Sequence, residues 1–401
     1  MTAPTGCAEI SKPGTGRRLS LGTLGHRVYD DVMSSRLILC VGTMLALGAC
    51  GGATGIGDST GESSGSSTGE AATTLDASSN PTTVATTTSG TSATSTTTAE
   101  TSPDSSGGRE DTSGTTGEPF PDPVADDCIT DVTPGHHEFT CDGLVYDIEI
   151  PDACLDAPCG MIFDVHGLAM SAQMQNACTN LRALGQEYGF IVVQPNADPP
   201  PPLANWIPGI DDDKVFAVMQ RVATAFHVDP DRWHFTGFSQ GGFMSWRFAC
   251  AHADVLASVA AGAACGNDFP ISDCQFTPDE SPTEPIDILY MHGTADLVVN
   301  YSCAIERRDA VIDHFALGDE QLLLDDPEVR RTRWSSDAMT FEYVEHDYTG
   351  DTPIAGGHCM PGADDPGGAP GQVVPASCDD PFVFVWGQAV IEFFIAHPRG
   401  A

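Results

Sequence analysis

The serine at position 239 has the neighbours that nucleophilic chemistry requires. Residues 235–241 read F-T-G-F-S-Q-G, which places a glycine two residues to either side of Ser239. The preceding residues predict a strand, and residues 241–251 predict a helix. A serine on a strained strand-to-helix turn exposes its hydroxyl, and bulky residues two positions away would block that turn. We therefore expect Ser239 to be a nucleophile; the alternative is a serine that only caps the helix.

A serine hydroxyl becomes reactive when a base takes its proton and an acid orients that base. The apolar strand predicted over residues 286–291 is followed by a loop that contains Asp296. The carboxyl ends of parallel strands share one edge of a sheet, so Asp296 should lie at the same edge as Ser239. Asp287 stands just before the apolar run I-L-Y-M at 288–291 and would lie at the opposite edge. Asp296 is therefore the expected acid.

Four histidines follow this acid along the chain: His314, His346, His358 and His397. His358 stands in G-G-H-C-M-P-G at 356–362, where the flanking glycines and the Pro-Gly pair predict a shaped loop that can present an imidazole. We expect His358 to be the base. His346, at the end of a predicted strand, is the alternative.

Two backbone amides should stabilise the oxyanion that forms when a hydroxyl attacks a carbonyl. A strand ending in F-D-V-H-G-L at 163–168 lies early in this region, and its glycine lets the backbone turn an N–H toward the developing charge. We expect the amides of Leu168 and Gln240 to be the donors, with Gly167 as the alternative to Leu168. His166 is expected to pack under the site rather than to react.

The elements that position these residues alternate between strand and helix patterns. Such alternation predicts an α/β fold with a mostly parallel sheet and helices on both faces. The expected strands cover 144–150, 161–165, 190–194, 233–236, 256–260, 286–291 and 339–345, and the expected helices cover 171–188, 211–227, 241–251, 303–315 and 383–396.

Together these motifs resemble the polyhydroxybutyrate depolymerase and feruloyl esterase family of α/β-hydrolases over most of residues 140–398. The resemblance rests on D-P-D-R at 229–232, the serine motif, H-G-T-A-D at 292–296 and G-H-C-M-P-G at 357–362. Met360 stands where that family usually has tryptophan. Asn205-Trp206 also fits, and we expect Trp206 near the substrate, with ordinary loop packing as the alternative.

The resemblance implies an α/β-hydrolase fold and carboxylic-ester hydrolysis through an acyl-enzyme on Ser239, without a metal or organic cofactor. The implied partners are polymeric or small esters: polyhydroxyalkanoate, or feruloyl and acetyl esters of plant polysaccharides. A serine peptidase of the same fold and a non-catalytic surface binding protein are the rival functions. The presence of Ser239, Asp296 and His358 in this order along the chain argues against a non-catalytic binding protein.

The chain divides into three expected parts: a signal region (1–49), a tether (50–119) and a catalytic domain (120–401). Residues 33–50 combine an arginine, a short apolar run and L-G-A-C, which resembles a lipoprotein signal with lipid added at Cys50. Met33 is then a natural start; an ordinary secretory signal or a short buried helix is the alternative. Residues 51–119 contain 45 Gly, Ser or Thr and no aromatic residue, which predicts a disordered tether.

The charge balance restricts the partners of the chain. The 401 residues include 17 basic and 56 acidic ones, a formal net charge of −39. Such a surface repels phosphate backbones and anionic lipids, so we expect no nucleic-acid partner and no membrane contact except through a lipid on Cys50. The expected location is outside the cytosol, either anchored to the cell envelope, with the outer membrane preferred, or extracellular.

Fourteen cysteines favour disulfides in an oxidising compartment. Eleven of them follow Cys50, so at least one must stay unpaired. Local spacing suggests the pairs Cys128–Cys141, Cys154–Cys159, Cys265–Cys274 and Cys359–Cys378, although spacing alone does not determine connectivity. The remaining cysteines are Cys178, Cys250 and Cys303.

Overall fold

The structure is a computed structural model that describes residues 120–265, 274–277, 280–350, 356–362, 377–379 and 382–400. The predicted signal region 1–49, the lipidation site Cys50 and the predicted tether 50–119 lie outside the described residues. Their roles therefore stay predictions.

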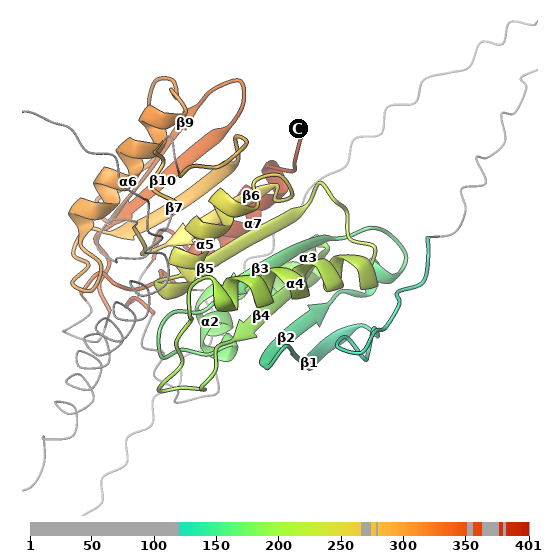
Figure 1. The fold of residues 1–401 in the computed structure, drawn as a ribbon. Coiled ribbons are helices and arrows are strands. Elements are labelled where there is room, and N and C mark those ends of the chain that lie inside the picture. The colour runs from blue at the N-terminus through green and yellow to red at the C-terminus, as the bar shows by residue number, and fades with distance from the viewer. Residues whose placement is uncertain are drawn as a thin grey trace, which may run out of the picture. The chain divides into compact units, whose positions relative to one another are not determined.

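Ten strands form a single sheet within the described residues (Figure 1). They are β1 (Gly135–Cys141), β2 (Leu144–Ile150), β3 (Gly160–Val165), β4 (Phe190–Asn196), β5 (Trp233–Phe238), β6 (Ser258–Gly262), β7 (Asp287–Gly293), β8 (Gln321–Asp325), β9 (Val329–Ser335) and β10 (Thr340–His346). The strand order is β1-β2-β4-β3-β5-β6-β7-β10-β9-β8. Neighbours from β4 to β10 are parallel, and the pairs at both ends are antiparallel.

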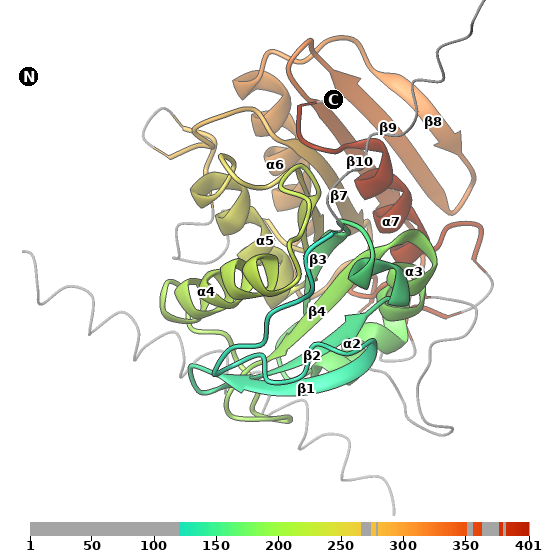
Figure 2. The same ribbon diagram turned by 90° about the vertical axis from the view of Figure 1, so that its right-hand side faces the viewer.

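Helices cover both faces of this sheet. The helical elements are η1 (Asp152–Leu155), α2 (Ala172–Thr179), α3 (Leu181–Tyr188), α4 (Ile210–Ala225), α5 (Gln240–Ala251), α6 (Tyr301–His314) and α7 (Trp386–Ala396). Figure 2 shows α4, α5 and α6 on one side of the sheet and α2, α3 and α7 on the other. The predicted fold class, an α/β-hydrolase sheet with helices on both faces, is confirmed.

The hydrophobic core is divided by the sheet into two layers. In β3, Phe163 packs in the layer with α4, α5 and α6, whereas Ile162 packs in the layer with α2, α3 and α7. Successive side chains of a strand point to opposite faces, so a strand covered on both sides needs apolar residues at every position. This is why the central strands read as continuous apolar runs. Among the described helices, none has the length and apolar character to cross a membrane.

Two features of the fold differ from the sequence prediction. The single helix expected over 171–188 is two helices, because Asn180 adopts a left-handed conformation (φ 52°) between α2 and α3. Strands β1, β8 and β9 were not predicted. They are the outer strands of the sheet. β1 and β9 are rich in polar residues and contain no apolar run, and β8 is a mostly exposed strand of five residues whose three leucines are a shorter run than those of the central strands.

Five disulfides lie within the described residues: Cys128–Cys141, Cys154–Cys159, Cys250–Cys274, Cys265–Cys303 and Cys359–Cys378. Three of these are predicted pairs, whereas the predicted Cys265–Cys274 pair is wrong. Cys265 follows β6, and Cys303 opens the helix that follows the neighbouring parallel strand β7. Both therefore meet at the carboxyl edge, with Cα atoms 5.8 Å apart. Among the cysteines that the structure describes, the buried Cys178 is the one outside a disulfide.

Candidate active site

Ser239 occupies a sharp turn between β5 and α5, with φ 52° and ψ −116°. An L-residue rarely adopts a positive φ, so the surrounding structure must hold this turn in place. A Cβ atom added at Gly237 would lie 2.8 Å from the carbonyl oxygen of Val165, and one added at Gly241 would overlap the same oxygen. The turn packs directly on the end of β3, which explains why both flanking positions need glycine.

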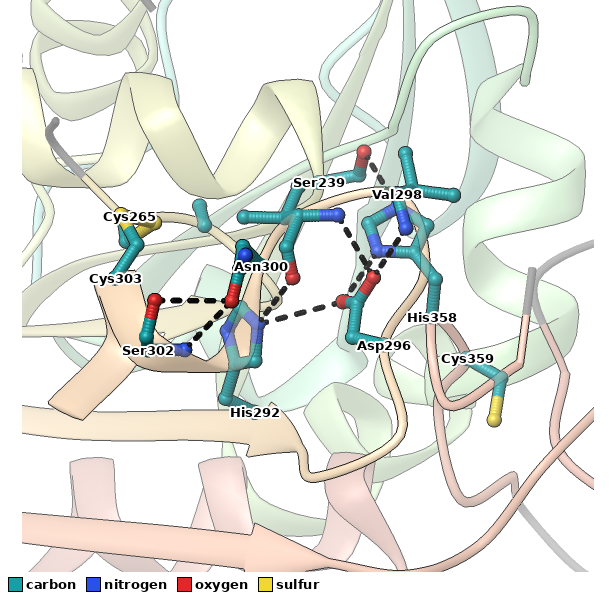
Figure 3. A network of polar contacts seen from close by, with 12 residues as sticks. Ser239, Cys265, His292, Asp296, Val298, Asn300, Ser302, Cys303, His358 and Cys359 are labelled. Atoms are coloured by element: carbon teal, nitrogen blue, oxygen red, sulfur yellow. Dashed lines mark hydrogen bonds and ion pairs between the residues drawn. A yellow bond between two sulfur atoms is a disulfide. The ribbon is translucent and has the colours of Figure 1, made fainter. Parts of the chain in front are cut away.

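The structure brings Ser239, His358 and Asp296 together in a row (Figure 3). The Nε2 atom of His358 lies 2.9 Å from the Ser239 Oγ, and its Nδ1 lies 2.7 Å from Oδ2 of Asp296. An ionised carboxylate can only accept hydrogen bonds, so Nδ1 carries a proton and Nε2 accepts the serine O–H. In this tautomer the imidazole can take the proton of Ser239.

The Asp296 carboxylate is held through both of its oxygens. The amides of Val298 and Val299 donate to Oδ1, each over 2.8 Å. On the other side, Nε2 of the buried His292 lies 2.9 Å from the Val299 carbonyl oxygen and 3.4 Å from Oδ2 of Asp296. A carbonyl oxygen only accepts, so His292 is the donor, and its Nδ1 can accept from the Tyr290 hydroxyl at 3.3 Å. These contacts fix the carboxylate that orients His358.

The loop that carries His358 is fastened at several points. The amide of Gly357 donates to the carbonyl of Ala295, beside the acid, and Cys359 forms a disulfide with Cys378. Met360, where the resembling family has tryptophan, is 0% exposed and belongs to the core. This position is therefore no part of an open pocket wall.

The alternative acid and base residues lie elsewhere. Asp287 begins β7 and accepts a hydrogen bond from His397 over 3.0 Å, at the amino end of that strand. His314 ends α6. His346 is 1% exposed and packs beside Gly293, but no hydrogen bond joins it to Ser239 or Asp296 in the described part of the chain.

The two expected oxyanion donors lie on segments that adjoin Ser239. Gln240 is the first residue of α5, and the amides of a first helical turn have no partner inside the helix. The backbone at Gly167 passes close to the nucleophile, since an added Cβ there would lie 3.1 Å from the Ser239 Cβ. The Leu168 amide follows it in the turn after β3. Among the described residues it has no hydrogen-bond acceptor.

Trp206 lies beneath the site, although the sequence placed it near the substrate. Its side chain is 1% exposed, its ring centroid lies 4.8 Å from that of His166, and its Nε1 donates to the His166 carbonyl. A buried indole offers no surface to a ligand, so the structure favours the packing alternative. The backbone amide of Trp206 donates to Oε1 of Gln240 over 3.0 Å, which ties this loop to the start of α5.

The supporting role of His292 escaped sequence analysis. In the sequence, His292 stood out only as the first residue of H-G-T-A-D at 292–296. Its main partner is the backbone carbonyl of Val299, and every residue carries such a carbonyl. The sequence therefore offers no signal for this contact.

Buried histidines should make folding stability depend on pH. Burial lowers the pKa of His166 and that of His346 to about 4, against about 6.5 in an unfolded chain. The unfolded state thus binds more protons below pH 6.5, and the free energy of unfolding falls as pH drops from about 6.5 to 4. We expect a loss of at most about 2 kcal/mol per histidine between pH 7 and pH 5.

Urea denaturation at the two pH values measures this loss. A His346→Gln variant should show a smaller difference between them than the parent protein. An equal difference in both proteins would contradict the contribution assigned to His346.

Removing the Cys359–Cys378 disulfide should reduce activity as well as stability, because Cys359 adjoins His358. In a Cys359→Ser/Cys378→Ser variant we expect kcat to fall about tenfold, since small misplacements of catalytic groups are costly. The matched control is Cys128→Ser/Cys141→Ser, which opens a loop of similar length (13 residues against 19) away from the site. Ester hydrolysis and thermal unfolding of both variants test this. Equal kcat values in the two variants would refute it.

Comparisons with known proteins give similarity over part of the chain. No protein-family model matches. Over 145 residues the chain is 28% identical to the bifunctional acetylxylan esterase/xylanase XynS20E of Neocallimastix patriciarum, covering 35% of this chain and 20% of that protein. Over 95 residues it is 30% identical to feruloyl esterase D of Neurospora crassa, covering 24% of this chain and 30% of the relative. The chain thus spans less than a third of the length of either relative.

Among solved structures, the acetyl xylan esterase from Aspergillus awamori aligns with a TM-score of 0.41 and 14% sequence identity, over 53% of this chain and 92% of that one. The two curated relatives are named as esterases, one of them a feruloyl esterase. The predicted resemblance to the feruloyl esterase-like α/β-hydrolases is therefore confirmed.

Proposed function

We propose that this chain is a serine hydrolase that cleaves carboxylic esters through an acyl-enzyme on Ser239. The observation that carries the proposal is the hydrogen-bonded row from the Ser239 hydroxyl through His358 to Asp296, with steps of 2.9 and 2.7 Å. Nucleophile, base and orienting acid come from three separate loops at the carboxyl edge of the sheet. Such a convergence is what acyl transfer requires.

In the first half of the reaction, Ser239 Oγ attacks the ester carbonyl carbon while its proton moves to Nε2 of His358. The carbonyl oxygen becomes an oxyanion, which the amides of Leu168 and Gln240 stabilise. The tetrahedral intermediate then collapses. The bond to the alkoxy group breaks, and that group leaves as an alcohol with the proton from His358.

In the second half, water replaces the alcohol. His358 takes a proton from the water, whose oxygen attacks the acyl carbon of Ser239. Collapse of this second intermediate returns the proton to Ser239 and releases the carboxylic acid. Asp296 stays ionised throughout and stabilises the imidazolium form of His358.

We infer that the substrates are acyl esters of plant polysaccharides, with acetyl or feruloyl groups, because the two curated relatives carry these activities in their names. Exposed apolar side chains next to the site suit an acyl or alcohol group with apolar surface. Leu297 and Val298 directly follow Asp296. Ile207 directly follows Trp206, whose backbone amide donates to the side chain of Gln240. Polyhydroxyalkanoate is the alternative polymer.

We further propose that the enzyme works outside the cytosol. The five disulfides within residues 120–400 support an oxidising compartment. The lipid anchor at Cys50 is a separate proposal, tested by metabolic labelling with a fatty acid: Cys50→Ala should lose the label that the parent protein carries.

Covalent labelling with a fluorophosphonate tests the proposed nucleophile. We expect the parent protein and Ser302→Ala to be labelled and Ser239→Ala to remain unlabelled. Ser302 is a matched control because it is an exposed serine close to the acid loop (Figure 3). Hydrolysis of methyl ferulate, acetylated xylan, polyhydroxybutyrate and nitrophenyl esters, with peptide anilides alongside, then defines the substrate. If Ser239→Ala is labelled as strongly as the parent protein, Ser239 is not the nucleophile. Cleavage of the peptide anilides alone would indicate a peptidase.

A further inference from the structure

The peptide unit between Gly167 and Leu168 is held from one side. The carbonyl oxygen of Gly167 lies 2.7 Å from Nδ1 of His166, and the Met170 amide donates to the same oxygen over 3.2 Å. In a trans peptide the N–H points opposite to the C=O. Anchoring the Gly167 oxygen therefore sets the direction of the Leu168 N–H.

The tautomer of His166 is determined by a backbone donor. The amide of Ala197 donates to Nε2 over 3.1 Å, so Nε2 must be unprotonated. A neutral imidazole then carries its proton on Nδ1, where the Gly167 carbonyl accepts it. The side chain is 0% exposed, and burial lowers its pKa to about 4, which keeps the ring neutral at neutral pH.

The position of the His166 ring is also fixed by Trp206, and hydrogen bonds of the same loop reach Gln240, which carries the second oxyanion donor. Trp206 packs on the imidazole and donates to the His166 carbonyl over 2.8 Å. The loop around Trp206 continues to Gln240, whose Nε2 donates to Oδ1 of Asn205 over 2.8 Å. The residues that carry the two amides expected to face the oxyanion are thus joined by one hydrogen-bonded network, which is buried at His166 and partly buried at Gln240.

We propose that His166 is a positioning residue: its Nδ1–H, directed by the Ala197 amide, holds the Gly167–Leu168 peptide so that the Leu168 N–H faces the oxyanion formed at Ser239. The inference rests on the proposed function, because it needs an oxyanion at this place. Donors oriented before the reaction need no reorganisation when charge develops, which is the condition for strong electrostatic stabilisation.

Two substitutions separate the two nitrogens of His166. In His166→Asn, the side-chain N–H₂ can occupy the place of Nδ1 and still donate to the Gly167 carbonyl. In His166→Gln, the longer side chain can place its oxygen near the position of Nε2, where it accepts from Ala197, but it leaves Gly167 without this donor. Both remove the ring that packs on Trp206, so they share the cost of that lost packing. His166→Asn also loses the acceptor of the Ala197 amide, a structural cost that His166→Gln avoids.

The measurement is kcat and KM for a nitrophenyl ester, with the inhibition constant of a boronic acid that occupies the oxyanion site. We expect His166→Asn to keep kcat within about threefold of the parent, and His166→Gln to lose about 10- to 100-fold, since a whole oxyanion donor is worth 10²–10³. KM should change little, and the inhibition constant of the boronic acid should rise by about the factor by which kcat falls. Equal kcat in the two variants, or a loss confined to KM, would overturn the proposal.

A second measurement needs no variant to fold. In parent protein labelled with ¹⁵N-histidine, the His166 ring should show a protonated Nδ1 and an unprotonated Nε2 between pH 6 and 8. The opposite tautomer would exclude the proposed donor. Failure of the proposed function looks different, because the parent protein would then neither hydrolyse esters nor react with the fluorophosphonate.

Discussion

Asp296→Asn is expected to lower kcat about 10⁴-fold while leaving the fold intact. The expectation follows from the hydrogen bonds of the two carboxylate oxygens. Oδ1 accepts two backbone amides, from Val298 and Val299, so the single oxygen of asparagine must occupy that position. The amide N–H₂ then takes the place of Oδ2, 2.7 Å from Nδ1 of His358.

An N–H₂ group facing Nδ1 of His358 reverses the tautomer of that ring. Nδ1 would have to accept, so the proton would move to Nε2, which faces Ser239. An imidazole protonated at Nε2 cannot take the proton of the serine hydroxyl. The variant should therefore bind substrate normally and fail in the chemical step.

The matched control is Asp287→Asn, which changes the same residue type at the opposite end of β7. Asp287 bonds to His397 and to the Thr340 amide, far along the strand from the reacting atoms. We expect its kcat to stay within about twofold, because Asp287 begins β7 and none of its hydrogen bonds reaches the loop that carries Asp296. Steady-state ester hydrolysis by the two purified variants decides the matter. Similar losses in both would show that Asp296 acts only through the stability of the fold.

The parts of the site that could be predicted from the sequence are those with local signatures. The turn at Ser239 needs glycines at fixed offsets, and the apolar strand before Asp296 indicates the edge of the sheet at which that loop emerges. The glycines and the Pro-Gly pair around His358 favoured it over His346 as the base. These expectations agree with where the three side chains lie in the structure.

What could not be predicted depends on contacts with the backbone or between distant segments. His166 and His292 act on carbonyl oxygens, which every residue has. Cys265 pairs with Cys303 across two parallel strands, so proximity along the chain gave the wrong partner. Asn180 breaks a helix through its left-handed conformation, which asparagine tolerates but does not require.

The close packing of the Ser239 turn leads to the second large effect, which concerns folding. Gly241→Ala should destabilise the protein by at least about 3 kcal/mol, at the upper end of the range for overpacked cores. The new Cβ would overlap the carbonyl oxygen of Val165 and lie 2.9 Å from that of His166. Both are backbone atoms of a buried segment, so neither can move aside as a flexible side chain would.

Gly262→Ala is the control for Gly241→Ala, because it adds the same methyl group at the carboxyl end of β6. Its nearest neighbours would lie 3.4 Å away, an ordinary van der Waals distance. We expect its free energy of unfolding, measured by urea denaturation, to stay within about 1 kcal/mol of that of the parent. Alanine reduces the conformational entropy of the unfolded chain, which offsets part of any cost of the added methyl group. If Gly241→Ala folds, separating α5 from β3 should misplace Ser239 and lower kcat more than tenfold. Equal stability of the two variants would mean that the turn does not press on the end of β3, and the glycine at 241 would then need another explanation.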